Sequence, residues 1–303
     1  MSAYELEALI KMLRSGGPDL AAPPEKAREN FEAMLAGIPV PDDVKFETTT
    51  IGGVPARSST APEALSGRVL LYLHGGAYMV GSSLGYRTLS SALARAARAR
   101  GLTLDYRLSP ENPFPAAVDD AVAGYRGLLA QGVSPGSIAV AGDSAGGGLT
   151  VAMLIAARDA GLPMPAAALA ISPWADLACA GASMSTKAAQ DPQLNRDGLL
   201  AMAGLYLNGA SPETALASPI YGNLAGLPPL LIQVGSIEVL LDDSIRLAAR
   251  AGEADVAVQL EVWPGVPHVW HAFAHVLSEG RDAIQAAGAF LTARFEKQQE
   301  TSA

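Results

Sequence analysis

The chain has 303 residues, of which 50% are hydrophobic and 17% charged, so it is too apolar and too weakly charged to be a disordered segment. It carries 30 Asp and Glu against 21 Lys and Arg, a net charge of -9 that phosphate backbones and anionic lipid repel. Nucleic-acid binding and membrane-surface roles are therefore not expected. The length admits two domains, or one α/β domain that carries an inserted subdomain.

Signals for processing and for cysteine chemistry are few. Cys179 is the only cysteine, which excludes an intramolecular disulfide framework and a cysteine-based zinc cluster. The first 13 residues contain Glu5 and Glu7 where a secretory signal would have Lys or Arg, so we expect a cytoplasmic protein. No apolar run reaches the 18 or so residues that are needed to cross a bilayer.

The first 60 residues predict two helices and a hairpin. Apolar residues at spacings of three and four predict helices over residues 4–13 and 25–35. Two strands, over residues 44–51 and 54–57, are expected to form a hairpin around a Gly52-Gly53 turn.

Beyond residue 68, short apolar runs alternate with helical stretches, which is typical of a mostly parallel sheet with helices on both faces. Residues 182–219, here called the cap insert, contain a predicted helix over 199–207 and have no strand partner. With the N-terminal helices in 1–42, they are expected to cover the carboxyl edge of a sheet built from 43–181 and 220–303, where ligands bind in such folds. The expected parallel strands are 69–73, 102–105, 138–141, 167–171, 230–234 and 256–263.

The segment from Gly142 to Gly146 stands between a predicted strand and a predicted helix, and it has the G-x-S-x-G pattern of a nucleophile elbow. Small residues two before and two after Ser144 allow the chain to reverse sharply and to expose the serine hydroxyl. The N–H of Ala145 would then point at a developing oxyanion near the positive end of the helix. The plain structural alternative is a tight turn with an incidental serine. A phosphate-binding P-loop is not expected, because this segment lacks the Gly-Lys-Ser/Thr sequence that a P-loop needs.

A second motif, His74-Gly75-Gly76, ends the predicted strand 69–73. It offers another run of unhindered backbone N–H groups, which an acyl hydrolase needs for the rest of its oxyanion hole. We therefore expect Gly75, Gly76 and Ala145 to form this hole. The coincidence of two halves of one site argues against an incidental serine.

Together with residues 105–111 and 114–117, these motifs resemble the bacterial hormone-sensitive-lipase family of α/β-hydrolase carboxylesterases, over residues 69 to about 271. The resemblance implies an α/β-hydrolase fold, a helical cap and short- to medium-chain ester substrates. Acyl transfer of this kind itself needs no metal or organic cofactor. The resemblance also implies a shaping role for His74 and a homodimer formed through the last edge strand, 256–263. Ser109 and Asn112 stand where the family often has Ala and His, in a segment that we interpret as structural.

The triad of an α/β hydrolase runs Ser, acid, His along the chain, so the base lies after the serine. His268 follows the predicted strand 256–263 across a Pro-Gly-Val-Pro loop, where a base can reach back to the nucleophile. The spacing of His268, His271 and His275 is metal-like, but the H-E-x-x-H pattern of a zincin is not formed, since Ala272 follows His271. We expect no metal site, and structural or surface roles for His271 and His275.

Three acidic residues, Glu238, Asp242 and Asp243, follow the predicted strand 230–234. Alignment with the family's motif puts Glu238 in the triad position and Asp242 in the second acidic position, although the family more often has Asp as the acid. Glutamate can hold the imidazole by accepting from its Nδ1–H. For Asp242 and Asp243 we favour helix N-cap and first-turn charges.

The sequence therefore predicts a serine carboxylesterase that acts through Ser144, His268 and Glu238 and an acyl-enzyme. Two other classes remain open. The first is an amidase, lactonase or peptidase, which would share all of this machinery. The second is a non-catalytic binding protein of the same fold; such a protein is known to lose the catalytic histidine, whereas this chain has His268. The cap insert supplies the apolar candidates for the acyl pocket, which could equally pack within the cap: Met202, Leu205 and Leu207.

Overall fold

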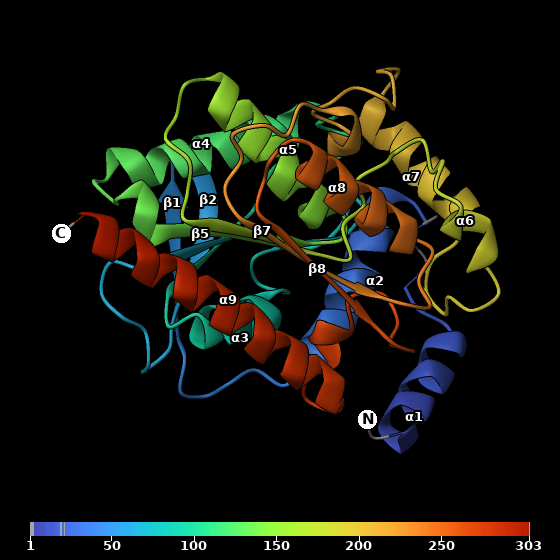
Figure 1. Ribbon diagram of the computed structural model, residues 1–303. Coiled ribbons are helices and arrows are strands. Elements are labelled where there is room, and N and C mark those ends of the chain that lie inside the picture. Colours follow the sequence, from blue (N-terminus) through green and yellow to red (C-terminus); the bar gives the residue numbers. More distant parts are fainter. Residues whose placement is uncertain (1–2, 19, 21, 303) are drawn as a thin grey trace.

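A computed structural model of the protein describes residues 3–18, 20 and 22–302 and contains an eight-stranded sheet flanked by helices (Figure 1). The strands are β1 (Lys45–Ile51), β2 (Val54–Thr60), β3 (Val69–Leu73), β4 (Arg100–Leu104), β5 (Ile138–Asp143), β6 (Ala167–Ile171), β7 (Leu230–Gly235) and β8 (Val258–Trp263). The helices are α1 (Ala3–Arg14), α2 (Pro24–Ala36), α3 (Arg87–Ala96), α4 (Ala116–Ala130), α5 (Ala145–Asp159), α6 (Ser183–Thr186), α7 (Arg196–Leu207), α8 (Leu241–Glu253) and α9 (Ser278–Ser302). Three 3₁₀ turns are η1 (Pro135–Ser137), η2 (Pro219–Tyr221) and η3 (Trp270–Phe273).

The strand order is β1-β2-β4-β3-β5-β6-β7-β8, and every pair from β4 onward is parallel. Strands β3, β5 and β6 are buried along their whole length because α4, α5 and α8 cover one face of the sheet while α3 and α9 cover the other (Figure 1). The predicted mostly parallel sheet between two helical layers is confirmed.

Element bounds differ from the predictions by a few residues at several ends. Strand β8 begins at Val258 rather than at residue 256, and β4 covers Arg100–Leu104 rather than 102–105. Helix α7 begins three residues early because the Asn195 side chain caps it and accepts from the N–H of Gly198.

The predicted hairpin is formed by antiparallel β1 and β2, with Ile51 opposite Val54. Both turn residues have positive φ, 60° for Gly52 and 85° for Gly53, which is the backbone of a two-residue type I′ turn. Gly52 also lies against α4, where a Cβ would overlap the carbonyl oxygen of Ala123. Glycine at position 52 thus allows the hairpin to pack on this helix.

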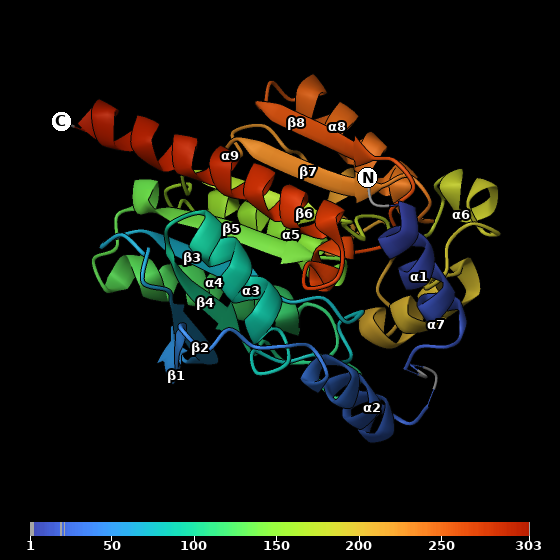
Figure 2. The same cartoon turned by 90° about the horizontal axis from the view of Figure 1, so that it is seen from below.

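Helices α1, α2, α6 and α7 lie together beyond the carboxyl ends of the parallel strands (Figure 2). The segment after β3 anchors two of them. Arg28 of α2 donates from Nε to the carbonyl oxygen of Met79 at 2.9 Å, and Tyr206 of α7 stacks on Tyr78 with ring centroids 3.8 Å apart. Among the described helices, none combines the length and the apolar character needed to cross a bilayer.

The hairpin offers a matched pair of substitutions. Gly53→Ala should lower the free energy of unfolding by about 1–2 kcal/mol, because it adds only the strain of a left-handed backbone in open space. Gly52→Ala should cost about 1–3 kcal/mol more, because its Cβ would also collide with α4. Urea unfolding of both variants measures the difference, and equal losses would contradict the close packing of Gly52.

Candidate active site

The turn between β5 and α5 has the strained backbone of a nucleophile elbow. Ser144 has φ 54° and ψ -122°, in a region that residues other than glycine rarely adopt. A Cβ at Gly146 would overlap the carbonyl oxygen of Leu73, and a Cβ at Gly142 would overlap that of Gly146. Only glycine fits at either end of the turn, which is the physical content of the G-x-S-x-G pattern.

Hydrogen bonds from neighbouring segments hold the backbone of Ser144. Its N–H donates to the carbonyl oxygen of Ile171 in β6 at 2.9 Å, and its carbonyl oxygen accepts from the N–H of Trp174 at 2.9 Å. The side chain itself is half-buried. The turn is therefore fixed to the sheet while the serine keeps access to the surroundings.

His268 and Glu238 form a hydrogen-bonded pair, with His268 Nδ1 lying 2.7 Å from Glu238 Oε2. The other carboxylate oxygen accepts from Ser172 Oγ at 2.8 Å and from the N–H of Gly235 at 2.7 Å. Glu238 is fully buried, and 6% of His268 is exposed. Donors thus satisfy both oxygens of a carboxylate that water cannot reach, and the pairing directs the imidazole Nε2 away from the acid.

The charges around His268 favour its protonated form. Burial lowers its pKa, but the charge of Glu238 and its hydrogen bond, together with the charges of Asp191 and Asp143, outweigh burial and raise the pKa above the ordinary value. For the Asp143 carboxyl, burial acts in the opposite direction and raises the pKa to about 6. The N–H of Ser144 donates to Ile171 and the N–H of Val269 donates to Ser172 Oγ at 3.2 Å, so the segments that carry the candidate nucleophile and the imidazole both lie at the carboxyl end of β6.

The structure does not support a free donor at Gly75. Its N–H donates to Asp143 Oδ1 at 3.0 Å, and the same oxygen accepts from the Tyr72 hydroxyl at 2.6 Å. The backbone N–H groups of Gly76 and Ala145 donate no hydrogen bond to any of the described residues. Of the three expected oxyanion donors, these two remain available, while Gly75 is taken up by a carboxylate that sequence reasoning had treated only as part of the elbow.

His74 lies fully buried behind the same loop. Its ring stacks on Tyr106 at a centroid distance of 4.3 Å, and its Nδ1 lies 2.7 Å from the carbonyl oxygen of Gly75. Burial lowers its pKa, so it stays neutral. These contacts fit a shaping role for the loop rather than proton transfer.

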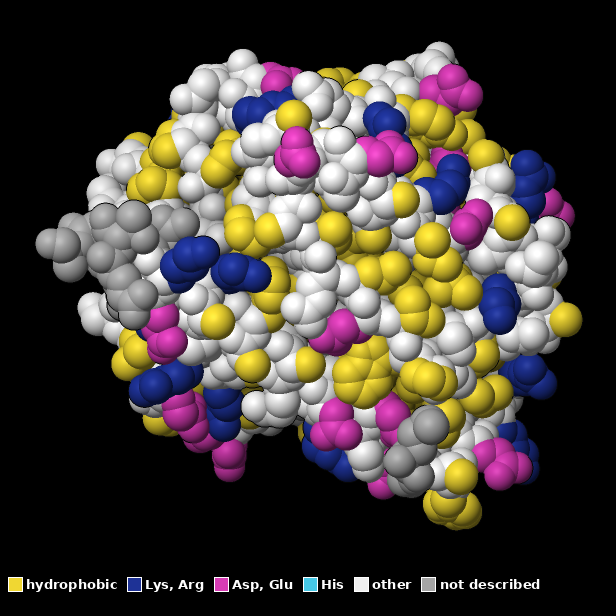
Figure 3. Space-filling view, in the orientation of Figure 1, with side chains coloured by type: hydrophobic (Ala, Val, Ile, Leu, Met, Phe, Trp, Pro, Cys, Tyr) yellow, Lys and Arg dark blue, Asp and Glu magenta, His cyan; other side chains and the backbone are white. Residues whose placement is uncertain are grey.

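The other two histidines lie apart from this pair. His271 is buried with Nε2 2.9 Å from Gln233 Oε1, and burial lowers its pKa to about 3, whereas His275 is exposed. No histidine is visible on the face shown in Figure 3. Within the described ranges, no group of three or more His, Cys, Asp or Glu side chains is placed to hold a metal ion.

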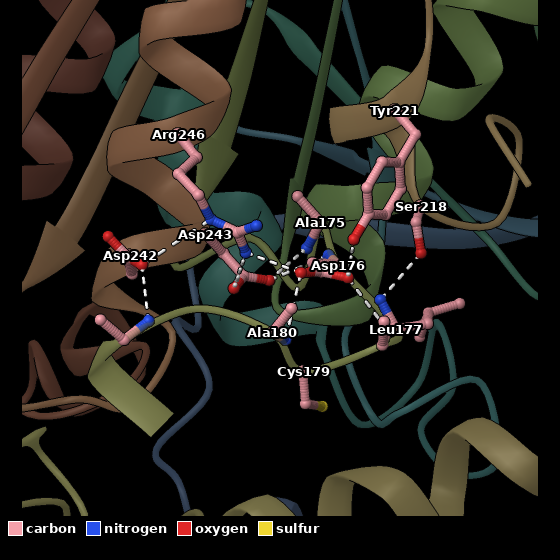
Figure 4. Close-up of polar contacts among 12 residues, drawn as sticks. Ala175, Asp176, Leu177, Cys179, Ala180, Ser218, Tyr221, Asp242, Asp243 and Arg246 are labelled. Carbon is pink, nitrogen blue, oxygen red and sulfur yellow. Dashed lines mark hydrogen bonds and ion pairs between the residues drawn. The ribbon is translucent and has the colours of Figure 1, made fainter. Parts of the chain in front are cut away.

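Asp242 and Asp243 lie in the first turn of α8, as expected, but the expectation of an N-cap is wrong because Leu240 occupies that position. Both carboxylates accept from the chain that leaves β6 (Figure 4). Asp243 Oδ2 accepts from the N–H of Ala175 and of Asp176 at 3.0 and 2.9 Å, and Asp242 Oδ2 accepts from the N–H of Ala182 at 2.7 Å. Neither forms a hydrogen bond with His268.

A buried ion-pair cluster next to this turn escaped sequence reasoning. Arg246 Nη2 lies 2.7 Å from Asp176 Oδ2 and 3.4 Å from Asp243 Oδ1, and both carboxylates are fully buried (Figure 4). Burial, with the nearby charge of Asp176, raises the pKa of Asp243 to about 8. The spacing of Arg246, three residues after Asp243 on one helix, is the only sequence signal for it.

The three apolar candidates from the cap insert have different environments. Met202 and Leu207 are buried within the main hydrophobic core, whereas Leu205 is 41% exposed. Tyr206 is the residue of α7 that meets the loop after β3, through its stack on Tyr78. The three residues that the sequence grouped as pocket candidates thus lie on different faces of α7, since Met202 and Leu207 are buried and Leu205 is exposed.

Comparisons with known proteins agree with this geometry. A family model described as alpha/beta hydrolase fold matches residues 70–272. An acetyl-hydrolase of Streptomyces hygroscopicus is 54% identical over 267 residues, which cover 88% of this chain and 87% of the relative.

Solved structures agree as well. An esterase from the bacterial hormone-sensitive lipase family is 48% identical, with a TM-score of 0.93 over 97% of this chain and 99% of that one. EstE5, in crystals soaked with p-nitrophenyl butyrate, is 46% identical, with a TM-score of 0.93 over 97% of this chain and all of that one. The chain belongs to the α/β-hydrolase fold family, and it is an esterase of the bacterial hormone-sensitive-lipase family.

Proposed function

We propose that the protein hydrolyses short- to medium-chain acyl esters with Ser144 as nucleophile, His268 as general base and Glu238 as the acid that orients it. The observation that carries the proposal is the 2.7 Å hydrogen bond between His268 Nδ1 and Glu238, at the end of the sheet where the elbow exposes the serine. His268 takes the serine proton, the alkoxide attacks the ester carbonyl, and the alcohol leaves with that proton. Water then attacks the acyl-enzyme by the same steps and releases the carboxylic acid product.

The amides of Gly76 and Ala145 are the proposed oxyanion donors. Gly75 contributes indirectly, since its hydrogen bond to Asp143 holds the peptide that leads into Gly76. Ala145 is the first residue of α5, so the positive end of this helix adds to the stabilisation of negative charge. The chemistry requires neither a metal nor an organic cofactor.

Chain-length preference follows from how the cap insert is attached. We propose that residues 1–42 and 182–219 form a cap over the site. Tyr206 stacks on Tyr78, and its carbonyl oxygen accepts from the N–H of Phe114 at 2.8 Å, so α7 is held close to the loop after β3. A fixed cap limits how much acyl chain the site can bury. The relative named an acetyl-hydrolase supports a small acyl group.

Assembly and location stay predictions. Strand β8 is an edge strand paired with β7, and 43% of its Val262 is exposed, so we propose a homodimer formed through β8. Light scattering of the purified protein measures its molar mass, and a monomer at micromolar concentration would contradict the dimer. A cytoplasmic location also stays a prediction.

Ser144→Ala should leave a folded protein whose ester hydrolysis is reduced by about 10³- to 10⁶-fold, because the variant cannot form the acyl-enzyme. Turnover of p-nitrophenyl butyrate measures the loss, and circular dichroism checks the fold. Ser134→Ala, on an exposed turn, is the matched control and should retain full activity. An active, folded Ser144→Ala variant would remove this serine from the mechanism.

Glu238→Gln should reduce kcat by about 10²-fold or more, because it replaces the charge that stabilises the imidazolium. Asp242→Asn is its control in the same segment, and it should change kcat less than about threefold since Asn keeps an acceptor for the N–H of Ala182. Steady-state kinetics of the two variants decide between the acids. A larger loss for Asp242→Asn would transfer the acid role to the aspartate.

Activity should peak near butyrate or hexanoate. Each methylene buried in the pocket contributes about 0.8 kcal/mol, until the acyl chain meets the cap and overpacking costs about 1–3 kcal/mol. A series of p-nitrophenyl esters from acetate to palmitate, with triolein emulsion beside it, gives kcat/KM against chain length. Rates that still climb at dodecanoate would contradict a closed cap.

A further inference from the structure

The cap insert binds the loop that carries Glu238. This loop, residues 236–240 between β7 and α8, is called the acid loop here. The N–H of Val239 donates to Asp191 Oδ2 at 2.8 Å, and its carbonyl oxygen accepts from Ser183 Oγ. Val239 itself is fully buried. Both backbone polar groups of the residue next to Glu238 are thus bonded to side chains of the cap insert.

Asp191 uses its second oxygen within the cap insert. Oδ1 accepts from the N–H of Gln193 at 2.8 Å and from the N–H of Leu194 at 2.9 Å, which closes a turn ahead of α7. One carboxylate therefore joins this turn to the acid loop. The three amide donors stabilise its ionised form.

Three carboxyl groups from three different elements act electrostatically on His268. Glu238 comes from the acid loop, Asp143 from the end of β5, and Asp191 from the cap insert. The negative charge of Asp191 raises the pKa of His268, and the positive charge of His268 lowers that of Asp191, so the two groups interact. Burial nonetheless leaves the pKa of Asp191 above its ordinary value.

We propose that Asp191 is a positioning residue of the esterase site: its carboxylate holds the acid loop through the N–H of Val239, and its negative charge acts on His268. The cap insert then completes the charge arrangement of the triad in addition to covering the substrate. This inference rests on the proposed function, since it takes His268 as the base and Glu238 as its partner.

Asp191→Asn tests the proposal, because Asn keeps one acceptor but loses the charge. Hydrolysis needs neutral His268, so kcat/KM falls on the acidic side through the pKa of this residue, which in the wild type lies above the ordinary histidine value. Without the Asp191 charge, the midpoint should move down by about half a pH unit or more. A displaced acid loop should also lower kcat on the order of tenfold, with little change in KM.

Asp197→Asn is the matched control, because this substitution removes the same charge from the same insert. Asp197 lies exposed in the first turn of α7. It should leave kcat and the midpoint unchanged. Asp191→Glu keeps the charge but moves the oxygen that Val239 uses, so the midpoint should stay while kcat falls. Should Asp191→Asn not fold, an unaltered kcat in Asp191→Glu would overturn the proposal.

A purely structural role predicts a different result, namely a lower melting temperature of Asp191→Asn with an unchanged pH midpoint, which would overturn the proposal. Histidine NMR gives a readout independent of turnover. In the Ser144→Ala background, the His268 resonance should titrate at lower pH when Asp191 is replaced by Asn. If Ser144→Ala stays active, the proposed function itself fails; if Ser144→Ala is inactive but the midpoint does not move, only the role of Asp191 is lost.

Discussion

The site depends on how closely the backbone of β3 approaches the turn that follows β5. Leu73 pairs with Gly142 in the sheet, and the carbonyl oxygen of Leu73 lies where any side chain at position 146 would stand. This approach places the loop after β3 beside the start of α5. The amides of two segments about 70 residues apart in the chain can then face one small volume, and no flexible side chain has to supply them.

The carboxylates around this volume are buried, which is unfavourable unless they are hydrogen-bonded, and each of them accepts hydrogen bonds from nearby donors. Glu238 has a donor on each oxygen, and Asp143 holds Gly75 as well as two tyrosine hydroxyls. Asp176 and Asp243 share Arg246 farther along the same edge. Because an unpaired buried charge costs several kcal/mol, each carboxylate is confined to the geometry of its donors. The rigidity of the site thus comes largely from its acids.

Sequence reasoning succeeds where the determinant is local. The elbow glycines, the hairpin turn and the alternation of strands and helices are each read within about a dozen residues, and these features predict the sheet and its layers. The pairing of His268 with Glu238 was reached through a motif alignment. The hydrogen bond from Gly75 to Asp143 spans 68 residues, and that from Val239 to Asp191 spans 48. Such contacts depend on how the elements pack, and no periodicity in the chain encodes them.

The attachment of the cap insert to the acid loop sets a boundary for recombination between relatives. Ala182, Ser183 and Asp191 each form a hydrogen bond with the stretch 239–242, so these two stretches form one packed unit although strand β7 separates them in the chain. In a chimera that takes only residues 182–219 from another esterase, the side chains of the insert would come from one protein and the acid loop that they bind from the other. Exchanging residues 182–242 as one block keeps the bonds between the cap insert and the acid loop within a single donor protein.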